Sequence, residues 1–261
     1  MDDKYKTLRF VDEVPNLVGS TNLLFRGGMP LDDNGKFDIH GLKEAIKYMY
    51  PQTPEDYYLV DISLVFDGDA GLAAERTYFS DPNNSNVGQL VWWPTEGSLR
   101  CYYKSDPAEQ DRLVGLFDEW LPDTLIRRTE TLRYMLQTSW VPGPTPPGPP
   151  SAPWWPNGTG IWPGYYQPPF VFYVHCDGGC DRTGEVIGAY RLRQGYSWFD
   201  MYYEQPCNRP MDCSNYRALQ WYAVWLNRMF GFKLEPYGDD GCSDPTPPAP
   251  VNGQPWAACS P

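Results

Sequence analysis

The fold class of this chain follows from one stretch, FVFYVHCDGGCDRTG at residues 170–184. It begins with the apolar and aromatic run 170–174, which is typical of a short β-strand buried on both faces. Gly178 and Gly179 then permit a tight turn, and residues 184–193 continue as a helix. This order predicts an α/β fold in which the loop lies at the carboxyl end of a parallel strand.

The loop of this stretch has five residues between Cys176 and Arg182. A thiol attacks phosphorus as its thiolate, and a helix N-terminus with a ring of backbone N–H groups favours that form. The planar fork of an arginine grips two phosphate oxygens, and Thr183 is placed to donate a hydrogen bond to the departing thiolate. We therefore predict a phosphate site whose binding residues are Asp177, Gly178, Gly179, Cys180, Asp181 and Arg182.

Composition sets the outer bounds on fold and partners. The chain has 261 residues, of which 41% are hydrophobic, enough for a sizeable α/β core. Length leaves one or two domains open, and we expect one domain over 1–235 with a Pro- and aromatic-rich insertion at 141–169. An irregular Pro-rich tail follows at 236–261. The net charge of −12 argues against nucleic acid and against adsorption to anionic lipid.

Hydrophobic periodicity predicts a central, mostly parallel sheet flanked by helices. No window approaches the ~20 apolar residues of a membrane helix, so we expect no membrane span. The oligomeric state stays open. The further strands are expected at 23–30, 57–65 and 87–93, and the further helices at 41–50, 106–120, 123–137 and 216–230.

The loop motif resembles that of the protein tyrosine phosphatase superfamily, and within it the small dual-specificity-type enzymes. The motif His-Cys-x5-Arg-Thr-Gly matches at His175, Cys176, Arg182, Thr183 and Gly184. Elsewhere, residues 24–30 look like the family's Tyr-Arg-Ser-x-x-Pro strand, 58–62 like its Val-Ile-Asp-Leu strand, and 195–198 like its Gly-Trp-Ser stretch. In order along the chain, the resemblance spans roughly 22 to 230.

The resemblance implies a Cys-based phosphatase fold and an enzyme that hydrolyses phosphate monoesters through a phosphocysteine intermediate. His175 would support the loop, and neither a metal nor an organic cofactor is needed. The implied substrate is a phosphorylated protein, as for tyrosine or dual-specificity phosphatases, or a small phosphomonoester. Phosphotyrosine needs a deep slot lined by aromatic side chains. Four residues could line such a slot or could instead be core residues: Trp92, Trp93, Tyr102 and Tyr103.

Two alternatives to a protein phosphatase stay open. Asp181 directly before Arg182 resembles the loops of myotubularin and Sac phosphatases, which favours a phosphoinositide or inositol phosphate substrate. The second alternative is of another class, a phosphatase-like module that binds phosphorylated ligands with little turnover. It is favoured by the lack of a plain Trp-Pro-Asp loop for the general acid.

The general acid has two candidates. Glu96 lies on the sequence Trp93-Pro94-Thr95-Glu96, the nearest match to the family's Trp-Pro-Asp loop. Asp181 lies within the phosphatase loop, although the neighbouring Arg182 favours its charged form. We favour Asp181, because the departure from the family's usual glycine at that position otherwise lacks a reason.

The seven cysteines allow several interpretations. We interpret Cys180 as a plain small residue; the alternative is a thiol that traps an oxidised Cys176 as a disulfide. A zinc site would combine His175 and Cys176 with Cys180 and later cysteines, but Arg182 would place a positive charge beside the cation.

The cellular compartment depends on the late cysteines. Reduced thiols indicate a cytoplasmic protein, which we favour by a small margin. Disulfides among the late cysteines, with the glycosylation triplets at Asn83 and Asn157, would instead indicate a secreted one. The late cysteines are Cys207, Cys213, Cys242 and Cys259.

Overall fold

The structure, a computed structural model, describes residues 5–17, 19–98, 106–139, 141, 168–207, 209 and 211–235. Nearly all of the predicted insertion and the whole of the predicted tail lie outside these residues. The chain divides into two compact units. The sheet unit consists of Met1–Thr95 and Thr131–Gly179, and the helical unit of Glu96–Glu130 and Cys180–Pro261.

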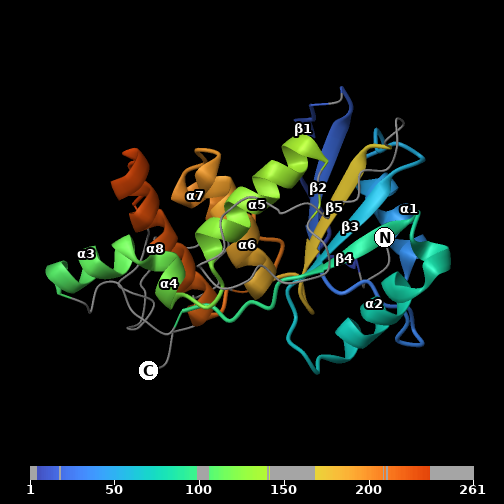
Figure 1. Cartoon of the computed structure of the whole chain (residues 1–261), viewed down its shortest axis with the longest axis horizontal. Helices are drawn as coiled ribbons and strands as arrows, with labels where there is room; N and C mark the ends of the chain where they lie inside the picture. Colours follow the sequence, from blue (N-terminus) through green and yellow to red (C-terminus); the bar gives the residue numbers. More distant parts are fainter. Residues whose placement is uncertain are drawn as a thin grey trace. The chain divides into compact units, whose positions relative to one another are not determined.

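The sheet unit contains a five-stranded sheet in the order β1-β2-β5-β3-β4 (Figure 1). The pairs β2–β5, β5–β3 and β3–β4 are parallel, and β1 is antiparallel to β2. The predicted α/β class with a mostly parallel sheet is confirmed. The strands are β1 (Arg9–Pro15), β2 (Thr21–Gly27), β3 (Tyr58–Ser63), β4 (Gly88–Trp92) and β5 (Phe170–His175).

Strand β5 lies in the middle of the sheet, and all six of its residues are buried. Its neighbour β3 is also buried along its whole length. Both were predicted as strands from nearly unbroken apolar runs, which a strand needs when helices or loops cover both of its faces. The central position of β5 brings its carboxyl end between the ends of β2 and β3.

Helices α1 (Ile39–Met49) and α2 (Ala70–Ser80) and the short 3-10 helix η2 (Pro82–Asn84) also belong to the sheet unit. Helix α1 begins at Asp38, whose Oδ1 accepts a hydrogen bond from the N–H of Gly41 at 2.9 Å, as an N-cap does. Its apolar residues Leu42 and Ile46 are fully buried in the core against the sheet.

The helical unit contains α3 (Pro107–Gly115), α4 (Phe117–Trp120), α6 (Asp181–Arg193), α7 (Trp198–Tyr203) and α8 (Cys213–Phe230). Helix α5 (Leu125–Thr138) begins in the helical unit and ends in the sheet unit. The single helix predicted at 106–120 is wrong in one respect, because it is interrupted at Leu116. Figure 1 shows α6 and α8 running beside one another.

Helix α6 begins at Asp181, three positions before the predicted start at residue 184. Arg182 and Thr183 therefore lie in the first turn of this helix and not in the preceding loop. Within the described part of the chain, no helix combines the length and the apolar character needed to cross a membrane.

A buried asparagine joins three elements of the sheet unit and yields a stability prediction. Asn22 donates to the carbonyl oxygen of Leu136 at 2.7 Å and accepts from the N–H of Phe170 at 2.9 Å. Asn22→Ala leaves both groups buried and unpaired, so the free energy of unfolding should fall by roughly 2–4 kcal/mol. Urea unfolding measures this. Asn34→Ala, on an exposed turn, is the control, and equal stability of the two variants would contradict the prediction.

Candidate functional site

Cys176 directly follows β5 and is 3% exposed, with a free thiol. His175, the residue before it, is bound to the segment that follows β3: the N–H of Leu64 donates to the carbonyl oxygen of His175 at 2.9 Å. The predicted loop passes from one unit to the other between Gly179 and Cys180. Its first half, 176–179, therefore belongs to the sheet unit, and its second half to the helical unit.

The first half of the loop is held by the residues at the end of β2. The guanidinium of Arg26 is buried and donates to the carbonyl oxygen of Gly179 at 2.9 Å. The N–H of Met29 donates to the carbonyl oxygen of Asp177 at 2.9 Å. Gly179 has a φ of +74°, and a side chain there would meet the backbone of Gly27 at 2.4 Å. Only glycine fits this turn.

His175 lies in a fully buried cluster of charged groups with Asp61 of β3 and Glu75 of α2. Its Nε2 is 3.1 Å from Oδ1 of Asp61 and 3.2 Å from Oε1 of Glu75. Burial alone would lower the pKa of His175, but the two carboxylates offset this and raise it to about 9. Burial raises the pKa of Glu75 to about 7. The imidazole is therefore protonated at neutral pH, one residue before Cys176.

The same three residues could also be considered as a metal site. Each offers one ligand atom, and these atoms all lie within 4.8 Å of one another. A protonated His175 already supplies the positive charge that the carboxylates need, and its Nε2 carries a hydrogen in that form. We therefore describe the cluster as a set of buried ion pairs at the end of β5, and the supporting role expected of His175 stays a prediction. Asp61 stood in a stretch singled out by resemblance, whereas no sequence signal indicated Glu75.

The second half of the loop is anchored covalently. Cys180 forms a disulfide with Cys207, with their Cα atoms 5.8 Å apart. Both interpretations of Cys180 are therefore wrong. Its sulfur is bonded to Cys207, so Cys180 is not a plain small residue and cannot form a disulfide with Cys176. The zinc alternative fails for the same reason, since Cys180, Cys207 and Cys213 are all disulfide-bonded and cannot bind a metal as thiolates.

Asp181 forms an ion pair with Arg209. Its carboxylate pairs with the guanidinium of Arg209 through both oxygens, one at 2.8 Å from Nη1 and the other in a shorter contact with Nη2. The N–H of Asp212 donates to it as well, at 2.8 Å. A bidentate arginine stabilises the charged carboxylate. These contacts are unfavourable for the role of proton donor.

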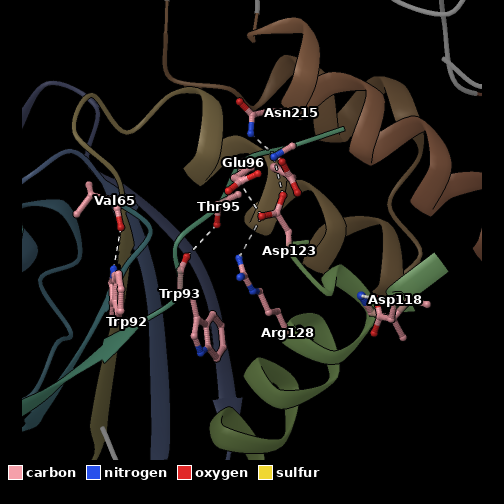
Figure 2. A network of polar contacts seen from close by, with 12 residues as sticks. Val65, Trp92, Trp93, Thr95, Glu96, Asp118, Asp123, Arg128 and Asn215 are labelled. Atoms are coloured by element: carbon pink, nitrogen blue, oxygen red, sulfur yellow. Dashed lines mark hydrogen bonds and ion pairs between the residues drawn. The ribbon is translucent and has the colours of Figure 1, made fainter. Parts of the chain in front are cut away.

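Glu96, the other candidate acid, is exposed, while its backbone is fixed. Its N–H donates to Oδ1 of Asp123 at 2.7 Å, as Figure 2 shows. Arg182 is half-buried in the first turn of α6, and Thr183 beside it is fully buried. The hydroxyl of Thr183 has no hydrogen-bond partner within the described part of the chain, so it is available to a group outside that part or to a ligand.

Two of the aromatic residues considered for a phosphotyrosine slot, Trp92 and Trp93, are described by the structure. Trp93 is 1% exposed and is a core residue. Trp92 donates from its indole nitrogen to the carbonyl oxygen of Val65 at 2.8 Å (Figure 2), and the guanidinium of Arg76 lies over its ring at 4.7 Å. Tyr102 and Tyr103 lie outside the described residues.

Comparison with known proteins adds no relative: no family model matches the chain, and no curated protein matches it significantly. What can be said of its activity therefore depends on the residues and contacts described above.

The charged cluster makes stability depend on pH. The pKa of His175 is raised from 6.5 to about 9, so its contribution is complete below about pH 6.5 and is lost as the pH rises through 9. The loss is on the order of 3 kcal/mol. The raised pKa of Glu75 adds a loss between pH 4.5 and about 7. NMR titration of the ring should give a value near 9, which Asp61→Asn lowers. A ring titrating at or below 6.5 would contradict the cluster.

Proposed function

We propose that this chain is a cysteine-dependent phosphatase that hydrolyses phosphate monoesters through a phosphocysteine intermediate. One observation carries the proposal. Cys176 keeps a free thiol at the carboxyl end of the central strand, directly after a protonated histidine, while Cys180 in the same loop is disulfide-bonded. The thiolate form of a cysteine is the nucleophile in such a reaction.

The reaction would proceed in two displacements. In the first, the thiolate of Cys176 forms a bond to phosphorus as the bond to the leaving oxygen breaks, and an acid protonates that oxygen. In the second, water attacks phosphorus and the sulfur leaves as thiolate. Arg182 and the loop amides bind the phosphate oxygens as charge develops. Thr183, with its buried hydroxyl, is proposed to donate to the departing sulfur.

For the acid we now favour Glu96 over Asp181. Both carboxyl oxygens of Asp181 already accept hydrogen bonds, from the guanidinium of Arg209 and from the N–H of Asp212. Glu96 is exposed, lies on the Trp-Pro-Thr-Glu sequence, and belongs to the same helical unit as Arg182. The aspartate before Arg182 has a structural reason that the sequence did not reveal, namely the ion pair with Arg209.

We propose a protein tyrosine or dual-specificity type of substrate, with singly phosphorylated inositides as the alternative. The loop carries Asp177 and Asp181 but no lysine, and the chain has a net charge of −12. Such a site is poorly matched to a headgroup with several phosphates. The arrangement favours one phosphate bound mainly by backbone N–H groups and one arginine.

The disulfide also bears on the compartment. Structural disulfides are rare in the cytosol and common in secreted proteins. Cys180–Cys207 and the bonded Cys213 therefore favour the secreted alternative over the cytoplasmic one.

The nucleophile is tested by substitution. Cys176→Ser should bind vanadate or phosphate while kcat falls by several orders of magnitude, since a serine hydroxyl is not ionised at neutral pH. Arg182→Lys should also lose most activity, because a point charge does not replace the bidentate fork. Steady-state kinetics on an aryl phosphate measure both. Cys176→Ser activity within tenfold of the wild type would rule out the mechanism, and a wild type that binds phosphate without turnover would favour the binding module.

The acid is tested by the leaving group. Glu96→Gln should lower kcat/KM for an alkyl phosphate by about 10²–10⁴-fold and leave an activated aryl phosphate nearly unchanged, because only the alkyl leaving group needs protonation. It should also remove the basic limb of the pH–rate profile. Asp181→Asn, the matched comparison, should slow both substrates by similar factors. The reverse pattern would return the role to Asp181.

A further inference from the structure

A buried aspartate of the helical unit binds the backbone of the candidate acid. Asp123 is fully buried between α4 and α5. Its Oδ1 accepts the N–H of Glu96 at 2.7 Å and its Oδ2 accepts the N–H of Gly97 at 2.6 Å. Figure 2 shows the carboxylate facing this segment. Both oxygens of one carboxylate thus hold two successive amides, which determines where the backbone of Glu96 lies.

The residues after Glu96 are fixed against the start of α8. Gly97 has a φ of +83°, and a side chain there would meet the backbone of Ser214 at 2.5 Å. The N–H of Ser98 donates to the carbonyl oxygen of Ser214 at 2.8 Å. A glycine is required at this close approach, so the backbone at 96–98 has little freedom to shift.

The same aspartate is connected to α6, the helix that carries Arg182. Glu185, one turn after the start of α6, is fully buried and accepts from the side-chain amide of Asn215 at 2.7 Å. Burial raises the pKa of Glu185 well above its ordinary range, and the charge of Asp123 raises it further. A raised pKa favours the protonated carboxyl group, which can donate a hydrogen bond to Asp123.

Arg128 lies near Asp123 and forms an ion pair with it. The guanidinium of Arg128 is buried, and its Nη1 is 3.9 Å from Oδ1 of Asp123. The buried set thus consists of Asp123, Arg128 and Glu185. Removing one partner of such a buried pair is strongly destabilising, yet apolar residues of similar size would often be as stable as the intact pair. The presence of a buried charged pair at this place is more readily explained by the position that Asp123 gives to the backbone of Glu96.

We propose that Asp123 is a positioning residue for the protonation step, because it holds the backbone of Glu96 at a fixed place relative to the helix that carries Arg182. Glu185 connects Asp123 to that helix. This inference depends on the proposed function and on Glu96 as the acid. It assigns no direct contact between Asp123 and the substrate.

A purely structural role is separated from this one by a matched control within the chain. Asp118 is a half-buried aspartate that also accepts two backbone N–H groups, those of Ile126 and Arg127 at 3.0 and 2.9 Å. It caps the start of α5 and does not hold Glu96. Asp118→Asn and Asp123→Asn each turn one of the two acceptors into an N–H donor, so they carry the same chemical change.

The kinetic test compares two leaving groups in the full chain. Asp123→Asn should lower kcat/KM for an alkyl phosphate by about 10²-fold, as a small misplacement of a reacting group does, and change that for an activated aryl phosphate by less than about threefold. Asp118→Asn should change both by the same factor. Equal effects of Asp123→Asn on the two substrates, or none on either, would overturn the proposal while leaving the phosphatase function intact.

A second measurement does not depend on activity. Hydrogen exchange of the Glu96 and Gly97 amides, followed by NMR, should be at least about tenfold faster in Asp123→Asn than in the wild type and unchanged in Asp118→Asn. Unchanged exchange in Asp123→Asn would overturn the proposal. A wild type with normal exchange but no turnover of either substrate would overturn the proposed function, and the catalytic role of Asp123 with it.

The link to α6 is tested with Glu185, which also guards against a variant that does not fold. Glu185→Gln keeps an acceptor for Asn215 and a donor for Asp123, so both the exchange rates and the ratio of the two kcat/KM values should stay at wild-type values. Glu185→Ala removes both contacts and should shift both readouts in the direction of Asp123→Asn. Wild-type readouts in Glu185→Ala would show that Asp123 does not act through α6.

Discussion

His175 carries a buried positive charge between the carboxylates of Asp61 and Glu75, at the point where β5 ends and the loop begins. A lone charge in this fully buried place would be costly, so the three groups must be retained together. Asp61 comes from the neighbouring strand and Glu75 from α2. The cluster therefore ties the carboxyl end of the central strand to two other elements, and the position of Cys176 depends on it.

The two halves of the loop are held by different means. Hydrogen bonds from Arg26 and Met29 hold the half in the sheet unit. A disulfide and the pair Asp181–Arg209 hold the half in the helical unit. The proposed function would have the loop bind phosphate through backbone N–H groups, which bind well only when their directions are fixed beforehand. Each half is anchored within its own unit.

The central elements were predictable because burial on both faces leaves a nearly unbroken apolar run, as in β3 and β5. Strand β1 and helix α2 were missed. Strand β1 is a half-exposed edge strand with charged residues among its apolar ones, so it lacks a continuous apolar run. Helix α2 buries few apolar residues, and one of its buried residues is Glu75. The start of α6 was placed too late, since Asp181 and Arg182 are polar and carry no hydrophobic period.

Local sequence was sufficient to indicate the α/β class and the order of strand, turn and helix around Cys176, because these depend on residue type and spacing within one short segment. The partners of the polar side chains were beyond its reach. Whether Asp181 meets Arg209, whether Cys180 meets Cys207 and whether Asp123 meets Glu96 depends on residues 27 or 28 positions apart in sequence. Only the folded chain brings such groups within hydrogen-bonding or covalent distance, and that proximity decides which of them is charged, bonded or able to give up a proton.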